Sequence, residues 1–445
     1  MFGAGDVRTS LRGAWLFDQI VTLGTLVLKD LGEGRSGEMA AHRYLSSPYV
    51  TTHGVLEALG ERTGQACVGR RIVAAQDTTE VSFFGKSAGD RGLGPGGDGK
   101  RASFFIHGVV AIDAQDEAVL GVVGAQIWTR GSEPLVPRSQ RPVEAKESRR
   151  WSQGAQMAAD RLGLAAHVVV VGDQEADIFS HFAHRPAQVD LLVRARHDRA
   201  LEDGGRLFAQ IRQWPVHTQA LVAVAPRGPG GKSRVAQVSI CSGRVTVLRS
   251  ASADPGDPPS LELGLVEVRE VRPPAGVKPL LWRLATTLPV DDPQAAQEVV
   301  RLYRLRWRIE EVFRALKSDG LRLEETQVRD PVRVFRLAAL ALGAAARIVA
   351  LVDARDGSRR PMGDVLDPSA APAVAALSRS REGGTARQQN HHPEGSLAWL
   401  SWVVARYGGW NCYGKPPGPK TMAKGWERFA ATLTGFILAT NEANV

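Results

Sequence analysis

Three acidic residues on separate segments of the chain could act together on a phosphodiester bond. Asp77 follows the apolar run that begins at Ile72, and Asp173 follows the run that begins at His167. The end of a buried strand presents its side chains to a crevice at the edge of the sheet. Glu310 lies in a segment with helical periodicity. Carboxylates from different elements bind hard divalent ions, and such ions catalyse phosphoryl transfer.

Polar and cationic side chains accompany Glu310 along its segment. If residues 295–317 form one helix with about 100° per residue, four side chains fall in one stripe ~21 Å long beside the apolar face. These four are Tyr303, Arg306, Glu310 and Lys317. The two cations would bind the phosphates on either side of the bond that is cut.

Simpler interpretations of the same residues stay open at this point. Each aspartate alone is a common turn or helix N-cap residue. Arg306 and Glu310 stand four residues apart and could be a solvated ion pair on the helix surface. Trp282, taken alone, could be a core aromatic residue between strands. The combination of three carboxylates on separate elements with flanking cations favours the catalytic interpretation.

The elements that must hold these residues are a mixture of strands and helices. In chain order, the patterns predict a strand at 72–75, strands at 102–113 and 118–129, a helix at 144–162, a strand at 167–171, and helices at 174–182, 295–317 and 334–352. Between 189 and 289, short strand-like runs separated by Pro and Gly predict a mostly β insertion. This order indicates a mixed α/β domain with helical ends.

Five regions follow from these patterns. They are a helical N-terminal region at 1–69, the first part of an α/β core at 70–188, a β-rich insertion at 189–290, the last part of the core with the helix of Glu310 at 291–330, and a helical C-terminal region at 331–445. Within the last region, residues 354–394 are rich in Pro, Gly, Ser and Arg, which is typical of a linker or mobile loop.

Composition limits the classes of protein to which the chain can belong. Of 445 residues, 43% are hydrophobic and 23% charged, which excludes a disordered or collagen-like chain. The net charge of +9 favours polyanionic partners such as nucleic acid. Three widely spaced cysteines form neither a disulfide framework nor a zinc pattern and fit a reducing cytoplasm.

Neither a membrane nor a nucleotide cofactor is expected. The longest apolar tract, 334–352, contains Arg336 and Arg347, so we interpret it as a buried core helix rather than a membrane span. The first residues contain no apolar run of signal-peptide length. The glycine-rich stretch 92–97 follows no buried strand and opens no helix, so it does not predict a dinucleotide site.

Three segments resemble the acidic motifs of a known family. Asp77-Thr78-Thr79, the segment from Gly172 to Ile178, and the spaced set Tyr303-x2-Arg306-x3-Glu310-x6-Lys317 are similar to those of bacterial insertion-sequence DDE transposases with the Y-R-E-K signature. The resemblance runs over nearly the whole chain. It implies a ribonuclease-H-like mixed-sheet core with a β-rich insertion, a helical N-terminal DNA-binding region and a helical C-terminal dimerisation region.

The resemblance also implies a role for each site residue. Asp77, Asp173 and Glu310 would bind two Mg²⁺ or Mn²⁺ ions per active site. Tyr303, Arg306 and Lys317 would contact phosphates, and Trp282 would stack on a base flipped out of the duplex. Arg194 and Arg196 stand two apart on a strand-like run, hence on one face, and match basic positions near the transposon strand.

The implied reaction is cut-and-paste transposition. It consists of nicking, attack of the freed 3′-hydroxyl on the opposite strand to close a hairpin, reopening of the hairpin, and strand transfer into target DNA. The implied partners are double-stranded DNA, as terminal inverted repeats and as target, and a second copy of the chain in the DNA-bound complex. The expected location is the bacterial cytoplasm, at the nucleoid when bound to DNA.

Two alternatives are a site- or structure-specific nuclease without strand transfer, and a non-enzymatic relic that binds transposon ends. The presence of Asp77, Asp173 and Glu310 argues against the relic. The stripe from Tyr303 to Lys317, together with Trp282, argues against a plain nuclease, which has no need to close a hairpin.

Overall fold

The computed structural model describes residues 6–442 except 33, 84–90, 132–147, 225–233, 252, 318–319, 356 and 359. The chain divides into two compact units. Unit 1 consists of Met1–Arg71, Thr78–Pro134 and Arg308–Val445, and unit 2 of Ile72–Asp77 and Leu135–Trp307. Strand β1 (Arg71–Ser82) contributes to both units, because the division falls within it.

The sheet of unit 1 is built from a hairpin and the second part of β1. Strand β2 (Ser103–Asp113) pairs antiparallel with β3 (Val119–Trp128), in the order β3-β2-β1. Every residue of β2 is buried, as expected for a strand with a neighbour on each side. The hairpin predicted from 102–113 and 118–129 is confirmed.

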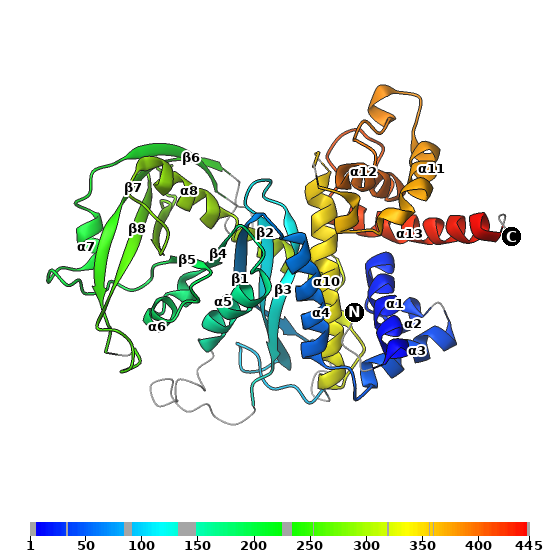
Figure 1. Cartoon of the computed structure of the whole chain (residues 1–445), viewed down its shortest axis with the longest axis horizontal. Coiled ribbons are helices and arrows are strands. Elements are labelled where there is room, and N and C mark those ends of the chain that lie inside the picture. The colour runs from blue at the N-terminus through cyan, green and yellow to red at the C-terminus, as the bar shows by residue number, and fades with distance from the viewer. Residues whose placement is uncertain are drawn as a thin grey trace. The chain divides into compact units, whose positions relative to one another are not determined.

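Helices surround this hairpin in unit 1. They are α1 (Val7–Leu23), α2 (Leu28–Leu31), α3 (Arg35–Ser46), α4 (Thr52–Ala66), α9 (Trp307–Leu316), α10 (Pro331–Ala354), α11 (Ala371–Arg381), α12 (Leu397–Tyr407) and α13 (Pro419–Glu442). Helices α4 and α10 pack against β3, and α1, α12 and α13 pack against α10 (Figure 1). The apolar face of the edge strand β3 is thereby covered.

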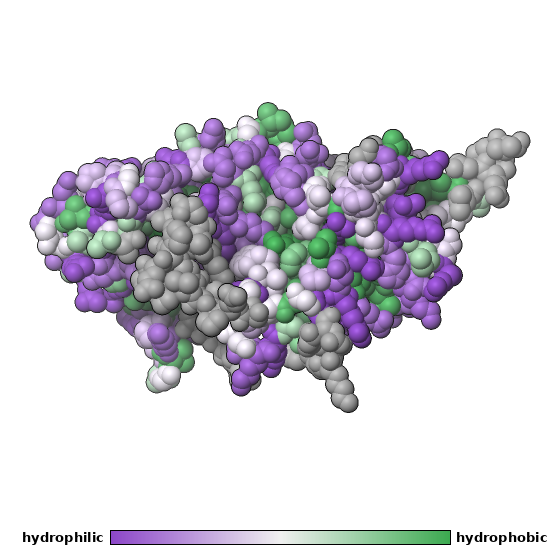
Figure 2. All heavy atoms as spheres, turned by 90° about the horizontal axis from the view of Figure 1, so that it is seen from below, coloured by the Kyte–Doolittle hydropathy of each residue, from purple (hydrophilic) through white to green (hydrophobic). Residues whose placement is uncertain are grey.

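Helix α10 is the apolar helix expected near 334–352. Among the described residues it is the one helix long and apolar enough to cross a membrane, and 89% of its apolar window is buried inside the protein. Arg336 donates to the carbonyl oxygen of Leu45 at 2.6 Å, and Arg347 pairs with Asp18 at 3.5 Å. Because both buried charges have partners, the interpretation as a core helix is confirmed. On the face in Figure 2, hydrophobic residues gather only in small groups among hydrophilic ones.

The Pro- and Gly-rich segment 354–394, expected as a linker, contains regular structure. Its elements are the 3-10 turns η5 (Met362–Asp364), η6 (Pro368–Ala370) and η7 (Ala386–Gln388), and helix α11. The N–H of Met362 donates to the carbonyl oxygen of Gly395 at 2.8 Å. Composition concealed α11 because its proline, Pro372, occupies the first turn, where a missing N–H breaks no intrahelical bond.

The sheet of unit 2 has the order β1-β4-β5-β9-β8-β7-β6. Its strands besides β1 are β4 (His167–Gly172), β5 (Asp190–Arg194), β6 (Thr218–Val224), β7 (Arg234–Leu248), β8 (Ser260–Glu270) and β9 (Leu281–Thr286). Strands β4 and β5 are parallel, and each pair from β5 to β6 along the sheet is antiparallel. The mixed α/β class and the β-rich insertion are confirmed.

Unit 2 also contains short helices, and the part of the helix expected at 144–162 that precedes residue 148 lies outside the described residues. These helices are α5 (Arg149–Arg161), the 3-10 turn η3 (Gln174–Ala176), α6 (Phe179–Ala183), α7 (Leu207–Ile211) and α8 (Pro293–Arg304). The expectation of one helix at 174–182 is wrong. The chain leaves helical geometry at Asp177 (φ −72°, ψ 69°), whose side chain instead binds backbone N–H groups of residues 196 and 197.

The single helix predicted at 295–317 is also wrong, because it consists of two helices. Helix α8 ends at Arg304 and α9 begins at Trp307. Between them, the N–H groups of Leu305 and Arg306 donate to the carbonyl oxygens of Leu302 and Tyr303, in short three-residue turns. No Gly or Pro marks the break, and the apolar spacing continues through it, so the sequence carries no signal for it. Tyr303 and Arg306 therefore do not share a helix with Glu310.

Candidate active site

In unit 2, Asp77 and Arg306 form a partly buried ion pair. The strand expected at 72–75 extends over Arg71–Ser82, so Asp77 lies within β1 and the expectation that it follows the strand end is wrong. Its Oδ2 accepts a hydrogen bond from Nη1 of Arg306 at 2.8 Å. The Arg306 side chain is 8% exposed and that of Asp77 19%. The turn between α8 and α9 directs the guanidinium inward, toward the strand. The structure thus brings together an acidic and a basic residue that the sequence analysis singled out separately.

Tyr303 lies beside this pair. Its ring meets that of Trp282 edge-on, with the centroids 5.4 Å apart, and both side chains are buried. Burial raises the pKa of the Tyr303 hydroxyl, while the charges of Arg306 and Arg194 and a hydrogen bond with Arg306 oppose the rise and Asp173 adds to it. The hydroxyl is therefore a protonated donor at neutral pH, and three other predicted site residues, Arg306, Arg194 and Asp173, act on it electrostatically.

Trp282 occupies a core position in this structure. It lies on β9 opposite Val268 of β8 and is 7% exposed. This burial matches the simpler interpretation, an aromatic residue packed between elements. Stacking on a DNA base would require the ring to turn away from Tyr303 or the neighbouring chain to open.

Asp173 follows β4, at the end of a buried strand, as the sequence predicts. Its Oδ1 accepts a hydrogen bond from the N–H of Glu175 at 2.7 Å, which caps the 3-10 turn η3. The residue is only partly buried. Asp173 therefore serves as a cap, and its carboxylate also reaches solvent, so the capping role and a ligand role are compatible.

The basic residues after β5 are held by an aspartate that the sequence analysis missed. Asp177 is 3% exposed, accepts hydrogen bonds from the N–H groups of Arg196 and His197 at 2.7 and 2.8 Å, and pairs with Arg199 at 2.5 Å. Asp177 thus fixes the loop that presents Arg196. The sequence signal that could have identified Asp177 is its position four residues after Asp173, in the same motif.

Arg194 and Arg196 do not share a strand face. Strand β5 ends at Arg194, which is partly buried and donates from Nη2 to the carbonyl oxygen of Leu281 at 3.1 Å. Arg196 lies beyond the strand and is exposed. The expectation that both residues lie on one strand face is wrong, because β5 ends two residues before Arg196.

Glu310 and Lys317, the last two residues of the spaced set Tyr303-x2-Arg306-x3-Glu310-x6-Lys317, lie in unit 1. Glu310 lies in the first turn of α9 and is partly buried. Nζ of Lys317, the residue after the helix, donates to the carbonyl oxygen of Glu80 at 2.6 Å and pairs with Glu324 at 3.2 Å. Phe313, on the buried face of α9, packs at Gly108 of β2, where an added Cβ would stand 3.4 Å from the ring.

The carboxylate oxygens of Asp77, Asp173 and Glu310 are suitable ligands for a hard divalent ion. Asp77 and Asp173 belong to unit 2 and Glu310 to unit 1, and all three side chains keep some exposure to solvent. Carboxylate oxygens are the ligands that Mg²⁺ and Mn²⁺ prefer. Among the described residues, no three His, Cys, Asp or Glu side chains are gathered in one place as a metal site.

Part of the chain matches the model of a known protein family. Residues 147–346 match the family described as the transposase DDE domain. The matched stretch contains Asp173 and Glu310, whereas Asp77 lies before it. The match supports a DDE transposase, and the mixed α/β fold with its mixed sheet is consistent with the ribonuclease-H-like fold of such transposases. Proteins of this class act on DNA, cutting and joining strands, and generally use divalent metal ions.

Proposed function

We propose that this transposase performs cut-and-paste transposition by nicking each end, closing and reopening a hairpin, and transferring the freed strand into target DNA. The observation that supports the proposal most is the Asp77–Arg306 pair at 2.8 Å beside the Tyr303 hydroxyl. A carboxylate, a guanidinium and a protonated phenol so close together provide an ion ligand and two phosphate donors.

Asp77, Asp173 and Glu310 would hold the divalent ions. When bound, such ions activate the attacking oxygen and stabilise the leaving oxygen of the phosphodiester. Because the ions would activate the attacking oxygen, the reaction would need no separate protein side chain as a base. Their exchange to asparagine or glutamine would keep the shape and remove the charge that attracts the ions.

Arg306 and Lys317 would bind the phosphates that flank the cleaved bond. Arg306 contacts Asp77, and Lys317 contacts Glu80 and Glu324. A phosphate oxygen accepts the same N–H groups. We therefore expect DNA to replace these internal partners, and Tyr303 to donate its hydroxyl hydrogen to a phosphate nearby.

Trp282 would stack on the flipped base during hairpin closure. Such stacking contributes roughly 1–3 kcal/mol per base. The proposal requires the Trp282 ring, which lies against Tyr303, to become accessible when DNA binds. Arg194 and Arg196 would contact the transposon strand through its phosphates.

The full partner set follows from the same proposal. The DNA substrates are the terminal inverted repeats of the element and a target duplex, and the active assembly is a homodimer held by the C-terminal helices. The expected location is the bacterial cytoplasm, at the nucleoid.

Joining of labelled element ends to a plasmid, with and without Mg²⁺, separates the proposal from its two alternatives. A transposase produces Mg²⁺-dependent joined products. A nuclease without strand transfer cuts the ends and joins none. A relic binds the ends and leaves them intact.

A further inference from the structure

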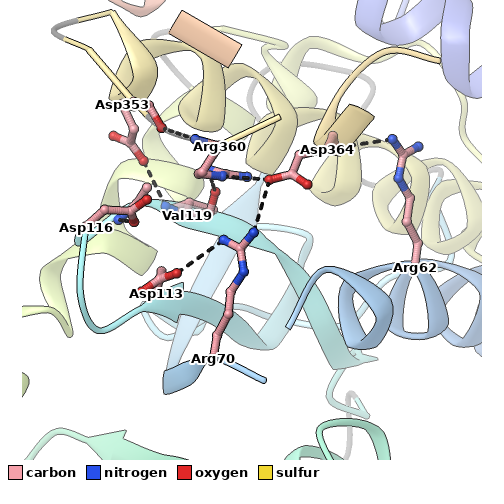
Figure 3. Close-up of polar contacts among 10 residues, drawn as sticks. Arg62, Arg70, Asp113, Asp116, Val119, Asp353, Arg360 and Asp364 are labelled. Atoms are coloured by element: carbon pink, nitrogen blue, oxygen red, sulfur yellow. Dashed lines mark hydrogen bonds and ion pairs between the residues drawn. The ribbon is translucent and has the colours of Figure 1, made fainter. Parts of the chain in front are cut away.

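A cluster of buried charges in unit 1 surrounds the first residue of β3. Asp353, near the end of α10, accepts the N–H of Val119 at 2.9 Å, and Arg360 donates to the carbonyl oxygen of Val119 at 2.9 Å (Figure 3). The Asp353 side chain is 8% exposed and that of Arg360 2%. Because β3 is an edge strand, these charges satisfy backbone groups that no neighbouring strand could.

The same Asp353 also holds the helix that carries Glu310. Its Oδ1 pairs with Nη2 of Arg308, in the first turn of α9, and Nη1 of Arg308 pairs with Glu311. Burial alone lowers the pKa of Arg308, but the charges of Asp353 and Glu311 outweigh it and leave the pKa above its ordinary value. Asp353 therefore joins three elements, namely α9, α10 and β3.

The ion pair adds a directional contact to a helix whose buried face is apolar. Helix α9 has ten residues, and its buried face consists of apolar side chains such as Ile309 and Phe313. Apolar contacts are not directional, so they permit small rotations about the helix axis. A hydrogen-bonded ion pair is directional and does not.

Arg308 and Glu310 lie on opposite sides of α9. Two residues correspond to about 200° around a helix. The Arg308–Asp353 pair therefore fixes the side of α9 that lies opposite Glu310. Fixing that side also fixes the direction of the Glu310 carboxylate. No contact between Asp353 and substrate is needed for this effect.

The remainder of the cluster does not touch α9. Asp364 pairs with Arg360 at 2.8 Å and with Arg70 at 3.9 Å, and Arg70 pairs with Asp113 at 3.2 Å (Figure 3). These contacts attach the segment after α10 to the end of β2. Asp364, at 10% side-chain exposure, is thus a buried carboxylate of the same cluster that lacks the link to the helix of Glu310.

We propose that Asp353 is a positioning residue for DNA cleavage, which acts through Arg308 to fix the rotation of α9 and the direction of the Glu310 carboxylate. The inference rests on the proposed role of Glu310. It adds a residue outside the acidic motifs to the set on which the reaction depends.

The test compares Asp353→Asn with the matched control Asp364→Asn in the full-length protein. Three quantities are measured: the single-turnover nicking rate with Mg²⁺, the affinity for end DNA without metal, and amide hydrogen exchange of α9 without metal or DNA. We expect Asp353→Asn to slow nicking about tenfold, as for residues that orient metal ligands. Its DNA affinity stays unchanged and its α9 amides exchange faster. Asp364→Asn leaves the nicking rate and α9 exchange unchanged.

Two results would overturn the inference while the proposed function stands. One is an Asp353→Asn protein with faster α9 exchange and an unchanged nicking rate, and the other is equal slowing of nicking by both variants. A wild-type protein that cuts no end would overturn the proposed function and the inference with it. Should Asp353→Asn fail to fold, the same measurements on Arg308→Lys decide the question, since lysine keeps the charge but loses the two-branched contact.

Discussion

At the scale of single residues, Arg306 organises the site. It neutralises Asp77 and bonds Tyr303, and it is buried, so both contacts are made where water screens them little. The guanidinium is always charged and offers several N–H groups, so it can exchange one acceptor for another when a phosphate arrives. A lysine at this position would offer a compact ammonium group without the planar, two-branched geometry of the guanidinium.

Removal of a carboxylate charge should stop catalysis without preventing DNA binding. Asp173→Asn keeps an oxygen that can accept the hydrogen bond of Glu175, so η3 stays capped. Glu310→Gln is the matching change on α9. We expect either variant to reduce cleavage more than about 100-fold, measured on labelled ends, with the affinity for end DNA within a factor of two or so of wild type. Residual Mg²⁺-dependent nicking by both variants would contradict the assignment of these ligands.

The role of Trp282 can be separated from its place in the core. Trp282→Leu keeps an apolar side chain against Tyr303 but removes the aromatic face. Loss of roughly 1.4 kcal/mol of base stacking corresponds to about a tenfold slower hairpin step. We expect first nicking to be little changed, and a time course on a denaturing gel resolves the two steps. Trp282→Phe, which retains a ring, is the control, and equal slowing of both steps in Trp282→Leu would refute the stacking role.

At the scale of elements, the junction of β4 with η3 sets the position of Asp173. Gly172 allows this junction to be tight, since a Cβ there would lie 2.6 Å from Cβ of Ala176 and 3.2 Å from the ring of Trp151. No side chain larger than hydrogen fits between the strand end and the turn. The packing of these two neighbours therefore determines where the carboxylate stands.

Gly172→Ala should thus damage both stability and activity. We expect a loss of about 1–3 kcal/mol of unfolding free energy from overpacking and slower cleavage, because η3 must move. Gly163→Ala is the control, since its added Cβ meets only the carbonyl oxygen of Ala159, at 3.8 Å. Chemical denaturation of both variants gives the measurement. A Gly172→Ala protein as stable as the control would show that the junction is less tightly packed than described.

Helix α6 introduces a pH dependence into unit 2. His181 is 1% exposed, its Nδ1 lies 3.3 Å from the Ser152 hydroxyl, and burial lowers its pKa to about 4. The unfolded chain takes up a proton near pH 6.5, whereas the folded protein does so only near pH 4. Unfolding therefore binds a proton between these values, and the histidine makes the fold less stable as the pH falls.

His181→Gln should remove this part of the pH dependence. Between pH 7 and pH 4.5, we expect wild type to lose ~2 kcal/mol more unfolding free energy than the variant, measured by urea denaturation at both pH values. Carboxylates titrate in both proteins, so the comparison isolates the histidine. Identical pH profiles would mean that His181 gains its proton in the folded state at an ordinary pH.

At the scale of the whole molecule, the sequence predicted strands and acidic positions better than helix boundaries. The run before Asp173 is β4, and the run before Asp77 is the first half of β1, because a continuous apolar run is a local signal. The continuation of β1 past Asp77 to Ser82 is not marked by such a run. The break between α8 and α9 has no local signal, since Arg306 is turned inward by Asp77, 229 residues away in the chain. Partners so distant cannot be read from spacing.

The same limit explains what was missed at the site. The binding of the Arg196 loop by Asp177 depends on side chains brought together by the fold. So does the Arg308–Asp353 pair, which joins two helices. Trp282 of β9 is buried against Tyr303 of helix α8, so a tryptophan that the sequence suggests as a stacking platform occupies a core position. Local patterns thus singled out the candidate residues, and tertiary contacts determine how these residues are arranged.

The most direct test of the account uses the purified protein, the labelled terminal-repeat duplex of its own element and Mg²⁺, with the products resolved on a denaturing gel. We expect a nicked strand to appear first and a hairpin band to follow it. Both bands are absent with Asp173→Asn. Bound but uncut DNA in the presence of Mg²⁺, or a nick that never proceeds to a hairpin, would contradict the proposed cut-and-paste reaction.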